Sequence, residues 1–175
     1  MDCPERVRSI LAELDIPEDL IRTRSLPLCP EAEALVVAEI GDDGREHRLA
    51  PDAAAAWQGM RAAAQTDGVV IRIASAFRSI DRQVEILRGK LAAGASLAEI
   101  LSASAPPGYS EHHTGRAVDI TTDGVAPFEV EFEQTPAFAW LAENAGRFGF
   151  VLSFPHGNQY GYQYEPWHWF HRASA

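Results

Sequence analysis

The hydrophobic residues of segment 4–65 predict a helix, then two strands, then a second helix. Residues 4–14 carry apolar side chains three to four positions apart and predict a helix. The segments 34–40 and 45–49 flank an acidic, glycine-containing turn and predict an antiparallel hairpin. The alanine-rich stretch 53–65 predicts a second helix, which ends before an Asp-Gly pair.

In the remaining two thirds of the chain, segments with the hydrophobic spacing of helices and segments with that of strands follow one another in an irregular order. The pattern predicts a strand over 69–74, helices over 79–93 and 97–102, a loop over 105–116, a strand over 117–120, a helix over 136–148, and strands over 150–154 and 164–170. This order lacks the regular strand–helix alternation of a doubly wound sheet. We therefore expect an α+β fold, a mostly antiparallel sheet with flanking helices, in one domain over residues 1–175.

Composition and charge narrow the class of protein. Hydrophobic residues make up 46% and charged residues 23%, the balance of a soluble globular domain. The formal charge of -10 argues against a partner nucleic acid or an anionic membrane. With no apolar run long enough for a signal peptide or a membrane span, a cytoplasmic protein is expected if Met1 is the native start. Cys3 and Cys29 form no CxxC motif and are expected to be free thiols.

Candidate metal ligands lie in two segments of the second half. His112 is in a loop where Gly115 permits a sharp turn, and Asp119 follows on a predicted strand, so a nitrogen and a carboxylate can face one point. Glu165 and His168 offer a third ligand together with a carboxylate that can act as a base. Two histidines and one carboxylate leave a fourth position open, which is typical of catalytic zinc. An HExxH helix is absent from the sequence.

These segments carry a family resemblance. Residues 110–119 match SxHxxGxAxD, residues 165–168 match ExxH in the form EPWH, and residues 75–79 followed by Gln83 are similar to an SxxRS...Q element. Together they resemble the VanY-type D-Ala-D-Ala carboxypeptidases and dipeptidases, zinc peptidases of peptidoglycan related in fold to the hedgehog domain and to lysostaphin-type enzymes. The resemblance covers roughly residues 70–170, and it implies a hedgehog/DD-peptidase-like fold.

The resemblance also implies roles for individual residues. It implies one zinc ion per chain, the zinc ligands His112, Asp119 and His168, the general base Glu165, a catalytic and substrate-binding Arg78, and substrate contacts from Ser110 and Gln83. Two alternatives remain. Arg78 can instead form a structural salt bridge at a helix start, and Ser110 can be a simple loop hydroxyl. His113 follows the expected ligand His112, and because side chains of neighbouring extended residues point apart, His113 is expected not to bind the metal. Phe170 stands where the family commonly has an arginine.

The expected function is hydrolysis of the peptide bond before a C-terminal D-Ala in peptidoglycan stem peptides, as an L,D- or D,D-carboxypeptidase. Soluble muropeptides or precursors are the expected substrates, because no export signal is visible. The enzyme alternatives are a D-Ala-D-Ala dipeptidase and a phage-type endopeptidase. A zinc-bearing binding module of the same fold is the non-enzyme alternative. Glu165 argues against that module, since binding needs no base.

Overall fold

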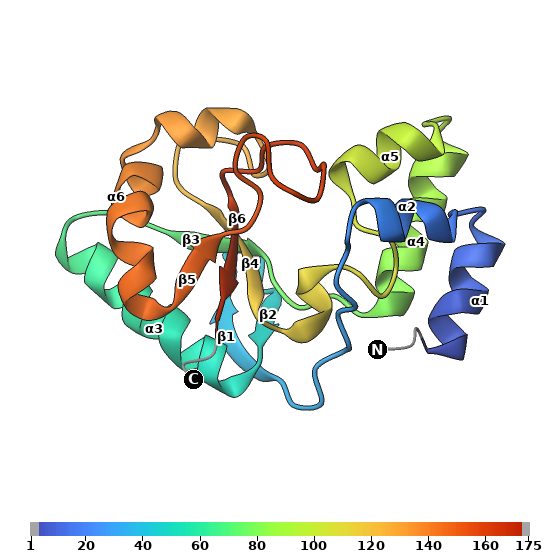
Figure 1. Cartoon of the computed structure of the whole chain (residues 1–175). Helices are drawn as coiled ribbons and strands as arrows, with labels where there is room; N and C mark the ends of the chain where they lie inside the picture. The colour runs from blue at the N-terminus through green and yellow to red at the C-terminus, as the bar shows by residue number, and fades with distance from the viewer. Residues whose placement is uncertain (1–3, 173–175) are drawn as a thin grey trace.

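Helices and antiparallel strands share the chain in the computed structural model, which describes residues 4–172 (Figure 1). Met1 and Cys3 lie outside the described residues. The elements in chain order are α1 Glu5–Glu13, α2 Glu18–Thr23, β1 Val36–Ile40, β2 Glu46–Leu49, α3 Pro51–Thr66, β3 Arg72–Ser75, α4 Ile80–Ala92, α5 Leu97–Ala103, η1 Glu111–Thr114, β4 Ala117–Thr121, η2 Val130–Gln134, α6 Pro136–Asn144, η3 Ala145–Phe148, β5 Phe150–Leu152 and β6 His168–His171. The predicted α+β class is confirmed.

The four-stranded sheet fixes the relative positions of three site segments. Its strand order is β3-β4-β6-β5, and every neighbouring pair is antiparallel. Asp119 on β4 is in register with Ser75 on β3 and with His168 on β6. Residues opposite each other in an antiparallel pair lie about 4.5–5.5 Å apart, so the register brings segments distant in sequence to one point.

Two hydrophobic cores lie on either side of this point. In the first, α3 and α6 place Trp57 and Leu141, both fully buried, against the β4 residues Val118 and Ile120. The hairpin β1–β2 forms a separate two-stranded sheet beside α3. Burying these side chains supplies most of the stabilisation of the sheet part of the molecule.

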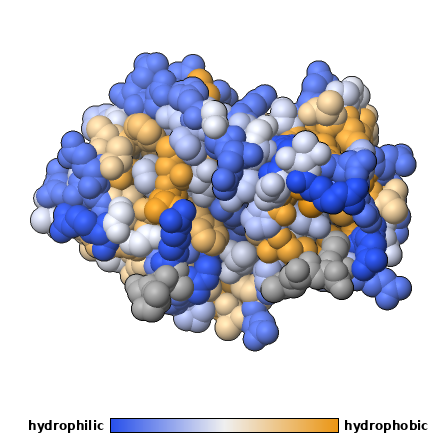
Figure 2. Space-filling view, viewed as in Figure 1, coloured by the Kyte–Doolittle hydropathy of each residue, from blue (hydrophilic) through white to orange (hydrophobic). Residues whose placement is uncertain are grey.

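The second core is helical and lies at the right in Figure 1. It joins Leu11 of α1, Leu87 of α4 and Ile100 of α5, all buried, with Tyr109 and Tyr162 from the loops that lead to the site. In the space-filling view, hydrophobic residues gather over this helical part, while polar residues predominate between the two parts (Figure 2). The helix α4 contributes Ile80, Val84 and Leu87 to the helical core, and its residues Gln83 and Lys90 line the pocket described below.

Several predicted boundaries were wrong. The strand expected over 69–74 begins only at Arg72. The strand expected over 164–170 begins at His168, because Glu165 O accepts the His168 N–H at 3.1 Å and closes a turn before it. The strand expected over 150–154 ends at Leu152, and the helix expected over 136–148 leaves the α conformation after Asn144.

Three short elements were missed. The stretch 105–116, predicted as a loop, contains the 3-10 turn η1, and the prediction overlooked α2 and η2. Each of these has at most six residues, too few for a hydrophobic period to be recognised. Within residues 4–172, none of the helices has the length and apolar character that crossing a membrane requires.

Candidate active site

The turn η1 sets the direction of His112. Gly115 ends this turn at φ 66°, and a Cβ there would approach Leu35 Cδ2 to 2.9 Å and the Ala50 backbone nitrogen to 3.0 Å. Glycine alone suits both this conformation and the space. The ring of His112 is 3% exposed, and its Nδ1 lies 2.7 Å from the Ala76 carbonyl oxygen. Because a carbonyl only accepts, Nδ1 carries the proton and Nε2 is left with its lone pair toward the site.

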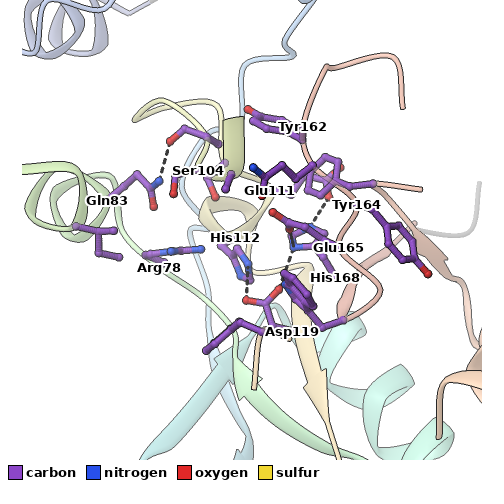
Figure 3. Close-up of a pocket in the computed structure, with 18 of the residues that line it drawn as sticks. Arg78, Gln83, Ser104, Glu111, His112, Asp119, Tyr162, Tyr164, Glu165 and His168 are labelled. Carbon is purple, nitrogen blue, oxygen red and sulfur yellow. Dashed lines mark hydrogen bonds and ion pairs between the residues drawn. The ribbon is translucent and has the colours of Figure 1, made fainter. Parts of the chain in front are cut away.

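Three donor groups meet on the central strands. His112 Nε2 lies 3.1 Å from Asp119 Oδ2, and His168 Nδ1 lies 3.0 Å from Asp119 Oδ1 (Figure 3). One ligand atom from each of His112, Asp119 and His168 falls within 4.8 Å of the others, and all three residues are buried. Burial opposes ionisation of Asp119, but His112 and His168 outweigh it and hold the pKa of this carboxyl well below its ordinary range.

Glu111 contacts Nε2 of His168, the ring nitrogen that does not contact Asp119, and the sequence did not predict this role. Its Oε2 lies 2.9 Å from His168 Nε2 and accepts a hydrogen bond of 2.6 Å from Ser153 Oγ. Burial alone would lower the pKa of His168, yet the carboxylates of Asp119 and Glu111 raise it to about 10. Glu111 thus fixes the ring orientation and leaves Nδ1 for the site. Its place inside the SxHxxGxAxD segment was the available signal.

The donor set fits a zinc ion. Two imidazole nitrogens and one carboxylate oxygen are ligands that zinc prefers, and three protein ligands are the usual number at a catalytic site. Each histidine has its remote nitrogen fixed by an oxygen acceptor, Ala76 O for His112 and Glu111 for His168. Such outer partners are typical of metal-binding histidines. The chemistry of the residues present therefore agrees with the metal that the sequence predicts.

Glu165 lies beside this cluster. The turn before β6 brings its Oε2 to 3.9 Å from His168 Nδ1, with 13% of the side chain exposed. Burial raises the pKa of Glu165 to about 7, against the opposing charge of His168, and Asp119 and Glu111 add to the rise. A carboxyl group with a pKa near neutrality is suited to accept and return a proton.

Arg78 and Gln83 line the same pocket, and each has a buried polar atom that is unpaired within residues 4–172. Arg78 Nε and Gln83 Oε1 are buried and have no hydrogen-bond partner among residues 4–172. Figure 3 shows the Arg78 guanidinium pointing toward His112, and the charges that act on it most strongly are Asp119 and Glu165. Gln83 Nε2 donates to the Ala105 carbonyl at 2.7 Å. Because unpaired buried polar atoms are costly, these two suit a bound substrate.

A pocket of about 360 Å³ contains all the predicted site residues. Its lining includes Arg78, Gln83, Ser110, His112, Asp119, Glu165 and His168, and it also includes Glu111. Aromatic side chains form part of its wall, with Phe128 and Trp167 meeting edge to face at 6.3 Å between ring centroids. The structure therefore places the seven residues singled out from sequence around one cavity.

Two neighbouring residues lie elsewhere. His113 Nδ1 donates to the Arg78 carbonyl at 2.6 Å, and its Nε2 accepts the Gly108 N–H at 3.1 Å, so the ring turns away from the pocket and joins two backbone segments. Burial lowers its pKa to about 4. Phe170, in place of the family arginine, pairs with Ala117 and Val151 on the sheet and lines a second cavity outside the pocket.

Comparisons with known proteins agree with this geometry. A profile described as VanY, D-alanyl-D-alanine carboxypeptidase, matches residues 46–174. A D-alanyl-D-alanine carboxypeptidase of Enterococcus faecalis is 37% identical over 117 residues, 61% of this chain and 42% of the relative. The chain spans less than two thirds of the length of the curated relatives it matches.

Solved structures of the same kind share the fold. The LdcB LD-carboxypeptidase superposes with a TM-score of 0.72 at 30% identity over 81% of this chain and 69% of that one. A vancomycin resistance D,D-pentapeptidase VanY in complex with Zn(II) gives a TM-score of 0.60 at 30% identity over 85% of this chain and 88% of that one. The fold is shared with these peptidases. This chain belongs to the VanY family of D-alanyl-D-alanine carboxypeptidases.

Proposed function

We propose that this chain is a zinc-dependent carboxypeptidase that hydrolyses the peptide bond before a C-terminal D-Ala in peptidoglycan-derived peptides. The observation that carries the proposal is the juxtaposition of the donor cluster His112, Asp119 and His168 with Glu165, whose pKa is raised to about 7, in one pocket. A binding module needs no such base, which argues against the non-enzyme alternative. Family membership supports the reaction class.

The roles of the residues follow from their positions. His112, Asp119 and His168 would hold zinc, which when bound supplies Lewis acidity toward the scissile carbonyl. Glu165 takes a proton from the attacking water and returns it to the leaving amine, a task suited to a carboxylate with a pKa near 7. Hydrolysis then consumes one water, breaks the C–N bond and releases D-Ala with a free amine.

Arg78 is proposed to bind the substrate carboxylate or carbonyl. Its guanidinium is a planar fork of donors, and its buried Nε has no partner within residues 4–172. Ser110 and Gln83 also line the pocket, and Gln83 Oε1 is buried with no partner within residues 4–172. A peptide terminus that pairs with these groups satisfies polar atoms that otherwise remain unsatisfied.

Soluble stem peptides are the proposed substrates. A pocket of about 360 Å³ is of a size for a short peptide end. The relatives include an LD-carboxypeptidase and a D,D-pentapeptidase, so either a tetrapeptide or a pentapeptide is a candidate. We propose both the L,D bond of the tetrapeptide and the D,D bond of the pentapeptide as candidates, because the LD-carboxypeptidase and the D,D-pentapeptidase are each 30% identical to this chain.

The test is incubation of the zinc-loaded protein with four substrates, each followed by mass spectrometry. The substrates are a stem tetrapeptide, a stem pentapeptide, the dipeptide D-Ala-D-Ala and a crosslinked peptide dimer. Release of one D-Ala from the tetrapeptide or pentapeptide is the expected result. Cleavage of the dipeptide alone identifies a dipeptidase, and cleavage of the crosslink alone an endopeptidase. Zinc-dependent binding of peptide with no cleavage of any substrate identifies a binding module.

A further inference from the structure

Lys90 is the single lysine of a chain with formal charge -10, and it lines the pocket. It lies in α4 with Gln83 and Ile86, and these three residues, spaced three, four and seven positions apart, share one helix face. That face lines the cavity that contains the metal-ligand candidates. The only lysine is thus at the one place where a peptide substrate is expected to lie.

The other charges of α4 are paired at the surface. Asp81 pairs with Arg6 at 2.6 Å, Arg82 with Glu85 at 2.7 Å, and Arg88 with Glu13 at 3.2 Å. Lys90 differs. Within residues 4–172 its Nζ contacts no carboxylate and donates one hydrogen bond, of 2.7 Å, to the neutral Ser104 hydroxyl. A cation beside a cavity with two further donor positions on its ammonium can accept an anionic ligand without losing an existing ion pair.

The spacing along α4 sets where that anion lies on a peptide. Seven residues of helix between Gln83 and Lys90 span roughly 10 Å at about 1.5 Å per residue. An extended peptide covers about the same length in three residues. Gln83 lines the pocket together with Arg78, the proposed anchor, and marks the position of the peptide end. Ile86 supplies an apolar surface between Gln83 and Lys90. The geometry therefore separates Gln83 and Lys90 by about three substrate residues.

We propose that Lys90 binds a free carboxylate that the substrate carries about three residues before its C-terminal D-Ala, so the enzyme prefers acidic peptides to their amidated forms. The inference rests on the proposed carboxypeptidase function and defines its substrate class. In a protein with a net negative charge, a local cation is needed to offset the repulsion of a second acidic group. Amidation of that group removes the attraction.

The kinetic test compares two peptides of the cleaved length that differ only in Glu or Gln three residues before the terminal D-Ala. Wild type should give a kcat/KM ratio of about fivefold in favour of Glu, the size expected for a partly exposed ion pair. Lys90→Met should bring the ratio close to one, and Lys90→Arg should keep it. Arg88→Met, which removes a cation from the same helix outside the pocket, is the matched control and should leave the ratio at its wild-type value.

A binding measurement separates this inference from the proposed activity. Reductive ¹³C-methylation retains the charge and labels Lys90 and the N-terminal amine alone, since no other lysine exists. In the Glu165→Gln background, the Glu peptide should shift the Lys90 methyl signal and the Gln peptide should shift it much less. If wild type cleaves neither peptide but Lys90 responds selectively in the Glu165→Gln background, only the proposed reaction fails. Equal ratios in wild type and Lys90→Met, or equal shifts with both peptides, would overturn the role of Lys90.

Discussion

Glu111 Oε2 lies 2.9 Å from Nε2 of His168, on the opposite side of the ring from Asp119. Ser153 Oγ donates to the same carboxylate oxygen, so Glu111 is itself fixed. The resulting chain of Ser153, Glu111 and His168 determines which nitrogen of the histidine faces the pocket. A carboxylate in this position also makes the ring a stronger ligand, because it stabilises positive charge on the imidazole.

Replacing Glu111 should weaken metal binding without removing a ligand. We expect Glu111→Gln to lower the affinity for zinc by roughly 10- to 100-fold, the usual effect of losing a carboxylate partner of a metal-binding histidine. Competition with a chromophoric chelator measures the affinity. Glu131→Gln, a carboxylate in η2 outside the pocket, is the control and should keep the wild-type affinity. Wild-type affinity in Glu111→Gln would mean that His168 needs no outer partner.

Glu165 should matter for turnover and not for metal content. Glu165→Gln keeps the shape of the side chain but cannot accept a proton, so kcat should fall by on the order of 10² to 10⁴ while zinc remains bound. Steady-state kinetics and metal analysis of the same sample give both values. Loss of zinc would instead make Glu165 a ligand, and near-normal turnover with zinc retained would exclude it from the mechanism.

The same substitution should stabilise the metal-free protein at higher pH. Since burial raises the pKa of Glu165 in the folded state to about 7, from a value near 4.5 when unfolded, the native state binds more protons between these pH values. Stability is therefore lost as pH rises from about 4.5 to 7. In the presence of chelator, Glu165→Gln should exceed wild type at pH 8 by on the order of 1 to 3 kcal/mol and equal it near pH 4.5. Urea unfolding at both pH values measures the difference, and a variant less stable than wild type at pH 8 would contradict it.

Arg78 should govern recognition of the peptide terminus. Arg78→Lys keeps the charge and loses the bidentate fork, so kcat/KM should fall by about tenfold, and Arg78→Ala should fall further, with fold and zinc content intact. The comparison uses a free-acid peptide and its C-terminal amide. If Arg78 binds the carboxylate, wild type prefers the acid and Arg78→Ala loses that preference. Equal losses on both substrates would assign Arg78 to the carbonyl, and unchanged kinetics would assign it a structural role.

The sequence was informative where the fold depends on local pattern. Amphipathic segments such as residues 4–14 and 79–93 became α1 and α4, and Ser79 caps α4 by accepting the Arg82 N–H at 3.0 Å. The site residues were found because each belongs to a short motif. Their meeting depends on sheet register, in which Asp119 faces both Ser75 and His168. Register between residues as far apart in sequence as Asp119 and His168, which are 49 positions apart, cannot be obtained from periodicity alone.

What the sequence did not reveal depends on tertiary contacts. Glu111 looks like a surface carboxylate in a polar loop, and only the approach of β6 and Ser153 makes it a partner of His168. His113 was expected to turn away because extended neighbours alternate, yet it lies in a 3-10 turn, and its hydrogen bonds to Arg78 and Gly108 set its direction. Lys90 gave no signal, since one charged residue on a helix is usually a solvated one.

Zinc dependence of D-Ala release tests the central claim most directly. The protein is stripped with chelator, dialysed, and titrated with zinc while release of D-Ala from the cleaved stem peptide is followed, with Asp119→Ala treated in parallel. We predict that stripping abolishes release, that one zinc per chain restores it, and that Asp119→Ala neither binds zinc tightly nor recovers. Full activity in the stripped protein, or zinc-restored activity in Asp119→Ala, would contradict a zinc peptidase built on His112, Asp119 and His168.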